Sequence, residues 1–317
     1  MNCVTTEQFF TNKYGIVLAA VVCTALWGSA FPVIKLSYEA LNIQQGDTAQ
    51  QVLFAGYRFF LAALLIFLFM ASFKKKIRYE QGSLKPLLIL GFFQTFFQYV
   101  LFYVGLSYST GIQGAIIAGT ISFFQIIFAH FMYANDKLSM RKTVGLFVGF
   151  TGVILVNVTR GTFEFQYGFG ELCLTIAMVS CAYGNILARN ASAKLNVMYL
   201  TASQMLLGGI GLLSVGVVFA GWMPFQFTPY SLGLLFYLAV LSSSGFVIWN
   251  NIMKYNYVGQ VSMYLFLIPV FGVLLSSFLL NEIIHIFVLL GLMFVTTGII
   301  IVNRKKPTRA QVLKSVS

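Results

Sequence analysis

The sequence predicts an all-α integral membrane protein with ten transmembrane helices, arranged as two inverted five-helix repeats. Of its 317 residues, 59% are hydrophobic and only 9% are charged, whereas a soluble protein carries about 25% charged residues. Such a chain cannot cover itself with a water-compatible surface, so soluble classes of protein are excluded. The apolar runs are continuous and lack the alternation of a membrane β-barrel. At about 20 residues per span, they leave room for roughly ten helices.

A segment at the end of each half is repeated, and this is the evidence for duplication. Residues 135–157 align with residues 281–303 without a gap, at a constant offset of 146 positions. Apolar matches mean little in membrane helices, but polar and glycine positions match as well. The matches are Asn135-Asp136 with Asn281-Glu282, Gly145 with Gly291, and Thr151-Gly152 with Thr297-Gly298. Such matches at one offset indicate a repeat, and repeated membrane halves are typical of transporters.

The expected helices follow one another with short connections. They cover residues 14–36, 50–72, 84–108, 112–133, 141–159, 168–189, 197–220, 230–252, 260–280 and 285–303. The first run is too long for a signal peptide and lacks a small-residue cleavage site, so we expect an uncleaved helix. The first repeat then spans residues 14–159, the second spans residues 168–303, and residues 304–317 form a basic cytoplasmic tail.

The distribution of lysine and arginine predicts the orientation of the chain. With the N-terminus inside, 17 of the 20 basic residues fall in cytoplasmic segments, and Arg160 falls in an outside loop. Cytoplasmic loops carry such an excess, so both termini are expected in the cytoplasm of a multi-pass cell-membrane protein. This explains the net charge of +12 without a nucleic-acid partner. Because five is an odd number, the two halves are inverted, which places a substrate site near the midplane between them.

Several short motifs resemble those of a known family. They are Trp27-Gly28-Ser29-Ala30-Phe31-Pro32-Val33-Ile34-Lys35, Arg58-Phe59, Pro269 followed by Asn281-Glu282, and the glycine-rich ends of helices 5 and 10. With them the chain resembles, over about residues 14–303, a drug/metabolite transporter of the ten-helix EamA type, made of two EamA repeats. The resemblance implies export of a small molecule through a cavity lined by helices 1, 3, 4, 6, 8 and 9. The family usually has a proline in helix 4, where Phe123 stands here, so a straighter helix 4 is expected.

Neutral polar and aromatic side chains at mid-depth are the candidates for substrate binding. A lipid-facing amide would leave hydrogen-bonding groups unsatisfied, so these side chains are expected to face protein or a cavity. The candidates are Trp27, Ser29, Gln94, Gln98, Ser122, Gln125, Tyr183, Ser244, Trp249 and Asn250. Taken singly, each residue serves more readily as a polar contact between helices, whereas the set favours a polar-aromatic cavity.

Three ionisable residues lie at one outer depth of the predicted membrane. Charge inside a bilayer costs several kcal/mol and is usually functional or paired. Lys35, Arg58 and Glu171 are therefore expected to form a vestibule that attracts a carboxylate, or a gate closed by ion pairs. The alternative is that their side chains reach out to the membrane surface. Pro269 in helix 9 is expected to act as a hinge.

The sequence carries no catalytic constellation. Its four cysteines lack metal-ligand spacing, and it has neither a glycine-rich phosphate loop nor a nucleophile–base pair, so no catalytic residue, metal or other cofactor is expected. The interpretation is a secondary transporter that exports a small organic metabolite, an amino acid or a related amphipathic compound. One alternative is a cation or drug exporter with an aromatic cage of Trp27, Tyr183 and Trp249; another is a membrane enzyme or a non-transport membrane protein. The expected partners are a small-molecule substrate and the lipid bilayer, with a homodimer left open.

Overall fold

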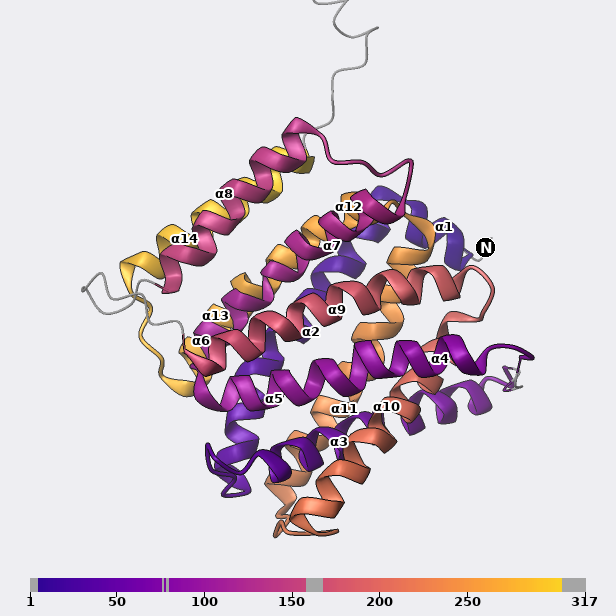
Figure 1. Ribbon diagram of the computed structural model, residues 1–317, viewed down its shortest axis with the longest axis vertical. Coiled ribbons are helices and arrows are strands. Elements are labelled where there is room, and N and C mark those ends of the chain that lie inside the picture. The colour runs from indigo at the N-terminus through magenta and orange to yellow at the C-terminus, as the bar shows by residue number, and fades with distance from the viewer. Residues whose placement is uncertain (1–4, 76, 78–79, 158–167, 304–317) are drawn as a thin grey trace, which may run out of the picture.

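The computed structural model describes residues 5–75, 77, 80–157 and 168–303, and within these ranges the chain forms helices and no strand (Figure 1). The predicted tail at 304–317, Arg160, and residues 158–159 of the first predicted repeat lie outside the described residues. The elements are α1 (Thr6–Thr11), α2 (Lys13–Ala40), α3 (Thr48–Ser72), α4 (Leu84–Gly91), the π-helix η1 (Phe92–Phe97), α5 (Gln98–Tyr108), α6 (Gly111–Ala118), α7 (Thr120–Met132), α8 (Met140–Asn157), α9 (Phe169–Ser192), α10 (Val197–Ala220), α11 (Pro229–Tyr255), α12 (Val258–Val261), the 3-10 helix η2 (Ser262–Phe266), α13 (Leu267–Leu280) and α14 (Ile286–Asn303).

Eight helical segments among the described residues are long and apolar enough to cross a membrane. They are α2, α3, α4 with η1 and α5, α6 with α7, α9, α10, α11, and α12 with η2 and α13. The helices α8 and α14 occupy the predicted fifth and tenth spans, but they have only 18 residues each and are not among the eight. The all-helical membrane class is therefore confirmed, whereas the number of ten spans stays a prediction.

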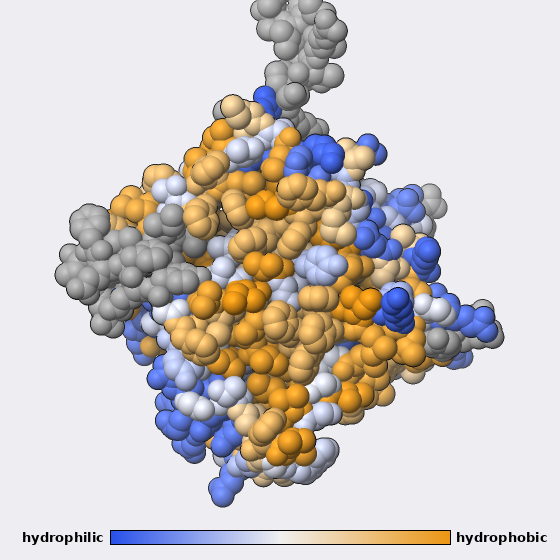
Figure 2. Space-filling view, viewed as in Figure 1, coloured by the Kyte–Doolittle hydropathy of each residue, from blue (hydrophilic) through white to orange (hydrophobic). Residues whose placement is uncertain are grey.

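The surface of the folded chain suits a bilayer. Figure 2 shows apolar residues across the middle of one face, and hydrophilic residues gathered at its lower left and upper right. Large apolar side chains such as Phe131, Val218, Phe219 and Phe278 are 75–81% exposed. A water-soluble protein rarely exposes contiguous apolar surface on this scale, and lipid is the solvent that such a surface fits. The protein is therefore a multi-pass membrane protein.

Helices of the first half pack mainly on helices of the second half. The pairs are α3 with α10, α8 with α14, α6 with α13, α2 with α11 and α13, and α9 with α5 and α7. If each helix is replaced by its equivalent in the other half, the same set of helix pairs results. In Figure 1, α8 and α14 lie side by side at the upper left edge of the molecule, apart from the other helices. The surface between the two halves therefore runs through the centre of the molecule.

The repeated glycines allow α8 and α14 to approach closely. A Cβ atom added to Gly145 would lie 2.8 Å from the carbonyl oxygen of Gly298, and one added to Gly152 would lie 2.5 Å from that of Gly291. Gly145 therefore meets Gly298, the repeat equivalent of Gly152, and Gly152 meets Gly291, the repeat equivalent of Gly145. Reciprocal contacts of this kind are those of a two-fold axis, and they require the two helices to run antiparallel.

Helix 4 is interrupted, although it lacks the proline. The segment α6 ends before Gly119, and α7 begins after it. A Cβ atom on Gly119 would lie 3.1 Å from Cγ of Pro269, so the interruption lies where the two broken helices touch. In helix 9, Pro269 lies in the first turn of α13, just after η2, where its missing N–H costs nothing. Gly119, four residues before Phe123, ends the first segment but keeps helical backbone angles (φ −58°, ψ −24°), so a straighter helix 4 stays a prediction.

Candidate functional site

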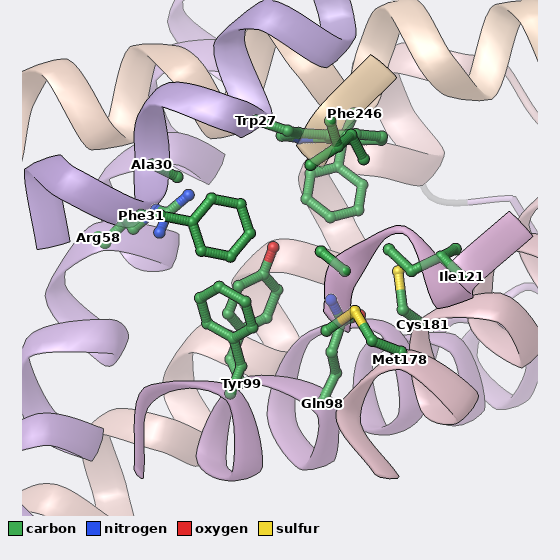
Figure 3. A pocket seen from close by; sticks show the side chains of 13 residues that line it. Trp27, Ala30, Phe31, Arg58, Gln98, Tyr99, Ile121, Met178, Cys181 and Phe246 are labelled. Atoms are coloured by element: carbon green, nitrogen blue, oxygen red, sulfur yellow. The ribbon is translucent and has the colours of Figure 1, made fainter. Parts of the chain in front are cut away.

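A small cavity lies where helices of both halves meet, and Figure 3 shows the side chains around it. Its volume is about 50 Å³, which holds a few water molecules and is smaller than an organic metabolite. Its walls come from α2, α3, α5, α6, α7, α9, α11 and α13. They are mostly apolar and include Phe31, Phe102, Ile121, Met178 and Phe246. The polar side chains in the wall are therefore the groups that can orient a ligand.

Arg58 on α3 supplies the charge in this wall. Its side chain is only 1% exposed. Its Nε donates to Oγ of Ser242 at 2.7 Å, and its Nη1 donates to the hydroxyl of Tyr103 at 3.0 Å. The guanidinium carbon also lies 5.0 Å from the centre of the Phe59 ring and 5.7 Å from that of Tyr99, which is within cation–π range. Hydroxyls and rings thus hold Arg58 in place without neutralising its charge.

Two predicted substrate-binding residues, Trp27 and Gln98, line the same cavity. The Trp27 ring lies 5.2 Å from Phe246 and 5.8 Å from Trp249, between ring centres. Both Nε1 of Trp27 and Oε1 of Gln98 are buried without a hydrogen-bond partner among the described residues. One is a donor and the other is an acceptor, and protein atoms enclose both of them.

The predicted amides Gln94 and Gln125 form a buried chain between helices. Gln94 Nε2 donates to Oδ1 of Asn185 at 2.8 Å, and Asn185 Nδ2 donates to Oε1 of Gln125 at 2.7 Å. Gln125 Nε2 then donates to Oγ of Ser262 at 2.7 Å, and the hydroxyl of Ser122 donates to the Ser262 carbonyl at 2.8 Å. The chain crosses from η1 through α9 and α7 to η2, so it ties the two halves together. Asn185 and Ser262 were not among the predicted site residues.

The remaining neutral candidates lie around the cavity instead of in its wall. The hydroxyl of Ser29 lies 2.7 Å from that of Tyr237, and Asn250 Nδ2 donates to Oγ1 of Thr201 at 2.9 Å. Trp249 is fully buried, and Ser244 is half-buried with no side-chain hydrogen bond among the described residues. The centre of the Tyr183 ring lies 5.0 Å from that of the Phe93 ring and 5.7 Å from that of the Phe128 ring. The structure thus brings Trp27 next to Trp249 but turns Tyr183 to other rings.

The three predicted vestibule residues do not form one cluster. Glu171 accepts bonds from the Ser109 hydroxyl and from the Gly168 N–H, both at 2.9 Å, so it holds the start of α9. Lys35 is half-buried near the end of α2, and its positive charge is attracted by the negative charge of Glu282. Within the described ranges no ion pair joins Lys35, Arg58 and Glu171, and no group of three or more His, Cys, Asp or Glu residues could hold a metal ion.

The matched carboxylates of the repeat hold the starts of two helices that belong to the opposite half. Glu282 accepts the N–H groups of Gly111 and Ile112, both at 2.8 Å, at the start of α6. Asp136 accepts the N–H of Gly259 at 2.6 Å, at the start of α12, and also binds Lys142 at 2.6 Å. Free N–H groups and the helix dipole make such a terminus attract a carboxylate. The sequence showed the two acidic positions to be equivalent, but it did not show this role.

Comparison with known proteins agrees with this two-part arrangement. The model of the EamA-like transporter family matches residues 14–158 and again residues 168–304. The chain belongs to the EamA-like transporter family. Both halves match one family model, so the expected family and its two EamA repeats are confirmed.

Curated relatives of this EamA-like protein are named as transporters. The uncharacterized transporter YoaV of Bacillus subtilis (strain 168) is 22% identical over 90% of this chain and 95% of its own length. YvbV of the same organism, also an uncharacterized transporter, is 25% identical over 94% of each chain. A crystal structure superposes with a TM-score of 0.71 at 14% identity, covering 92% of this chain and 96% of the other, and at that identity it supports the fold alone. The family and these relatives are transporters and not enzymes, which supports a membrane transporter.

Proposed function

We propose that this EamA-like protein is a secondary transporter that exports a small organic metabolite, an amino acid or a related amphipathic compound, across the cell membrane by alternating access. The observation that carries the proposal is the cavity between the two halves, whose wall holds Arg58, Trp27 and Gln98 among apolar side chains. A site at the interface of two repeats can be opened to one side and then to the other by rocking one half against the other.

The proposed architecture has ten spans in two inverted repeats, at residues 14–159 and 168–303, with both termini in the cytoplasm. The reciprocal glycine contacts support inversion, because Gly145 meets Gly298 and Gly152 meets Gly291. Helices of repeats with the same orientation would run parallel there. The excess of lysine and arginine in the expected cytoplasmic segments supports the direction.

The crossed carboxylates support two gates. On the proposed orientation, Asp136 lies on the cytoplasmic side and Glu282 on the outer side. Each one bonds the start of a helix from the other half, so each bond closes the gap between the halves at one end of the cavity. With both bonds formed, the cavity has room for only a few water molecules. Breaking one bond at a time would open one side at a time.

Flux through reconstituted vesicles tests the function. Purified protein is placed in liposomes loaded with a mixture of unlabelled amino acids and organic acids, and uptake of labelled members of the mixture is followed by exchange. We expect uptake above that of protein-free liposomes, and its loss in the double variant Gly145→Leu/Gly298→Leu, which separates α8 from α14. If no solute moves although the protein is folded, the protein is not a transporter of metabolites.

The second candidate is a cation exporter with an aromatic cage. It is favoured by the contact of Trp27 with Trp249, whose ring centres lie 5.8 Å apart beside the cavity. The third ring of the cage, Tyr183, contacts Phe93 and Phe128 instead. Exchange of quaternary amines in the same vesicles, with no exchange of amino acids, would select this candidate.

A further inference from the structure

We propose that a groove between α4, η1 and α10 binds one anionic phospholipid, with an acyl chain in the groove and the phosphate beside Lys85 and Lys75. The groove shares no lining residue with the central cavity, so it is a separate site. The inference goes beyond the transport function. It takes from that proposal only the orientation, which makes the bound lipid one of the cytoplasmic leaflet.

The groove is apolar and open at the surface. Its volume is about 580 Å³, within the range of about 300–1,000 Å³ that is typical of pockets for small ligands. Leu88 and Phe92 on one wall are 49% and 46% exposed, and Leu207 and Val215 line the other wall. No charged or hydrogen-bonding side chain is among the lining residues. The part of a ligand that enters this groove is therefore a hydrocarbon.

The local structure of both walls opens the groove. A π-helix bonds each residue to the fifth residue along the chain, and in η1 the rings of Phe92 and Phe97, five positions apart, are stacked with centres 5.8 Å apart. On the opposite wall, Gly208 and Gly211 have no side chain to fill the space between the helices. The aromatic wall and the glycine floor together leave room for a flexible chain.

The two walls run in the same direction. A Cβ atom added to Gly91 would lie 2.9 Å from the carbonyl oxygen of Gln204, and one added to Gly211 would lie 3.0 Å from the Phe96 ring. The contacts thus advance along both helices together, and the starts of α4 and α10 lie at one end of the groove. From residue 88 to residue 96 the wall rises about 12 Å. This fits within the hydrocarbon depth of one leaflet, about 15 Å.

Lysines lie at the end of the groove where both helices start. Lys85 is exposed on α4, one turn before Leu88 and Ile89 and so on the same face. Lys75 is also exposed, and its Nζ lies 3.4 Å from Sδ of Met198 in the first turn of α10. Among the described residues no carboxylate lies within 4.0 Å of either lysine. Each wall therefore has an unpaired positive charge at this end.

The charge of the groove is one-sided, and this points to the headgroup. In the connection between α3 and α4, at the right edge of Figure 1, Lys74 and Lys75 outnumber Glu80 among the described residues. At the other end, residues 221–228 follow α10 and contain no charged side chain. Anionic lipids of the cytoplasmic leaflet attract basic segments next to the membrane. A phosphatidylcholine carries its own positive charge and gains less from these lysines.

Native mass spectrometry of the purified full chain tests the proposal. The protein in detergent is titrated with phosphatidylglycerol or with phosphatidylcholine that has the same acyl chains, and the dissociation constant of the first bound lipid is measured. Each lysine near the surface favours an anionic lipid about fivefold, so we expect phosphatidylglycerol to bind roughly tenfold tighter or more. Equal affinities would overturn the inference. No transported solute is involved, so this failure is distinguishable from failure of the transport function.

Variants then locate the bound lipid. Lys85→Gln should reduce the preference for phosphatidylglycerol about fivefold, and Leu207→Trp, which fills the groove from α10, should weaken the binding of both lipids. The matched controls are Lys13→Gln, at an exposed lysine that starts α2, and Phe219→Trp, at an exposed position of α10 outside the groove. Both controls should leave the affinities unchanged.

Three results with these variants would contradict the site. If Lys13→Gln acts as strongly as Lys85→Gln, the preference belongs to the whole basic surface. If Leu207→Trp leaves both affinities unchanged, the lipid lies elsewhere. If the spectra show a dimer that Leu207→Trp dissociates, a second copy of the chain covers the groove. The comparison of the two lipids on the unaltered protein decides the headgroup preference even if a variant does not fold.

Discussion

Removing the charge of Glu282 should open the cavity to the outer side. Its two oxygens accept the N–H groups of Gly111 and Ile112 at 2.8 Å. Glutamine keeps one acceptor oxygen and loses the charge, so Glu282→Gln loses at least one charge-assisted bond. Hydrogen bonds to charged groups contribute about 1.5–3 kcal/mol. Since Glu282 is partly exposed, we expect the lower end of that range. About 1.4 kcal/mol is a tenfold change in an equilibrium, so the outward-open population should rise roughly tenfold.

A native cysteine reports on this opening. Cys181 lines the cavity and is almost fully buried, so a bulky thiol reagent reaches it only when the cavity is open. The other cysteines are removed by Cys3→Ser, Cys23→Ala and Cys173→Ala. A membrane-impermeant maleimide is then applied to right-side-out or to inverted membrane vesicles, and the rate of labelling is measured.

Substitution of the two carboxylates should make Cys181 reachable from opposite sides of the membrane. Glu282→Gln should raise the labelling rate about tenfold in right-side-out vesicles, and Asp136→Asn should raise it in inverted vesicles, because Asp136 holds the start of α12. Glu39→Gln, at an exposed carboxylate near the end of α2, is the control and should change neither rate. If both variants open the same side, the two bonds do not lie at opposite ends. If neither rate changes, the bonds are not gates, and this part of the reasoning is refuted.

Two further predictions concern stability. Gly298→Val should lower the melting temperature in detergent, because a Cβ atom there would lie 2.6 Å from the carbonyl oxygen of Gly145. Overpacking of this kind costs about 1–3 kcal/mol. The control Gly233→Ala should not lower the melting temperature, because its Cβ atom would meet nothing within 4 Å. Gln125→Leu should destabilise the protein by about 1–3 kcal/mol in thermal unfolding, because the Asn185 amide loses its acceptor and stays buried. An unchanged melting temperature in Gln125→Leu would show that Asn185 finds another acceptor.

Composition predicted the membrane class, since charged and apolar residues can be counted along the chain, and the family was expected from a resemblance carried by short motifs. They could not predict which atoms meet. The equivalence of Asp136 and Glu282 is visible at the offset of 146, but their partners lie 123 and 171 positions away. No local pattern links residues at such separations, so the crossed bonds could be found only in three dimensions.

The position of Arg58 shows a second limit. From the sequence alone, only the depth of Arg58 along its helix can be predicted. That depth is similar to the depth of Lys35, so the two residues were expected together in an outer vestibule. The face of the helix decides its surroundings, and that face depends on how α3 packs. The structure places Arg58 in the cavity wall with Gln98, while Lys35 lies near Glu282. Likewise the apolar run at 84–108 did not reveal the π-helix at Phe92–Phe97, which shifts the helical register between the amide chain and the cavity.

The changes of helical geometry within helices 4 and 9 support the proposal that each carboxylate controls one side only. In helix 4, Glu282 holds the start of α6, and the break at Gly119 separates that start from α7. In helix 9, Asp136 holds the start of α12, and η2 separates it from α13. The two irregular turns lie close to each other, since a Cβ atom added to Gly119 would lie 3.1 Å from Cγ of Pro269. A continuous helix would transmit movement of one end to the other. An irregular turn at these points would let one end move while the end beyond it stays packed, and the proposed alternating access requires this independence of the two sides.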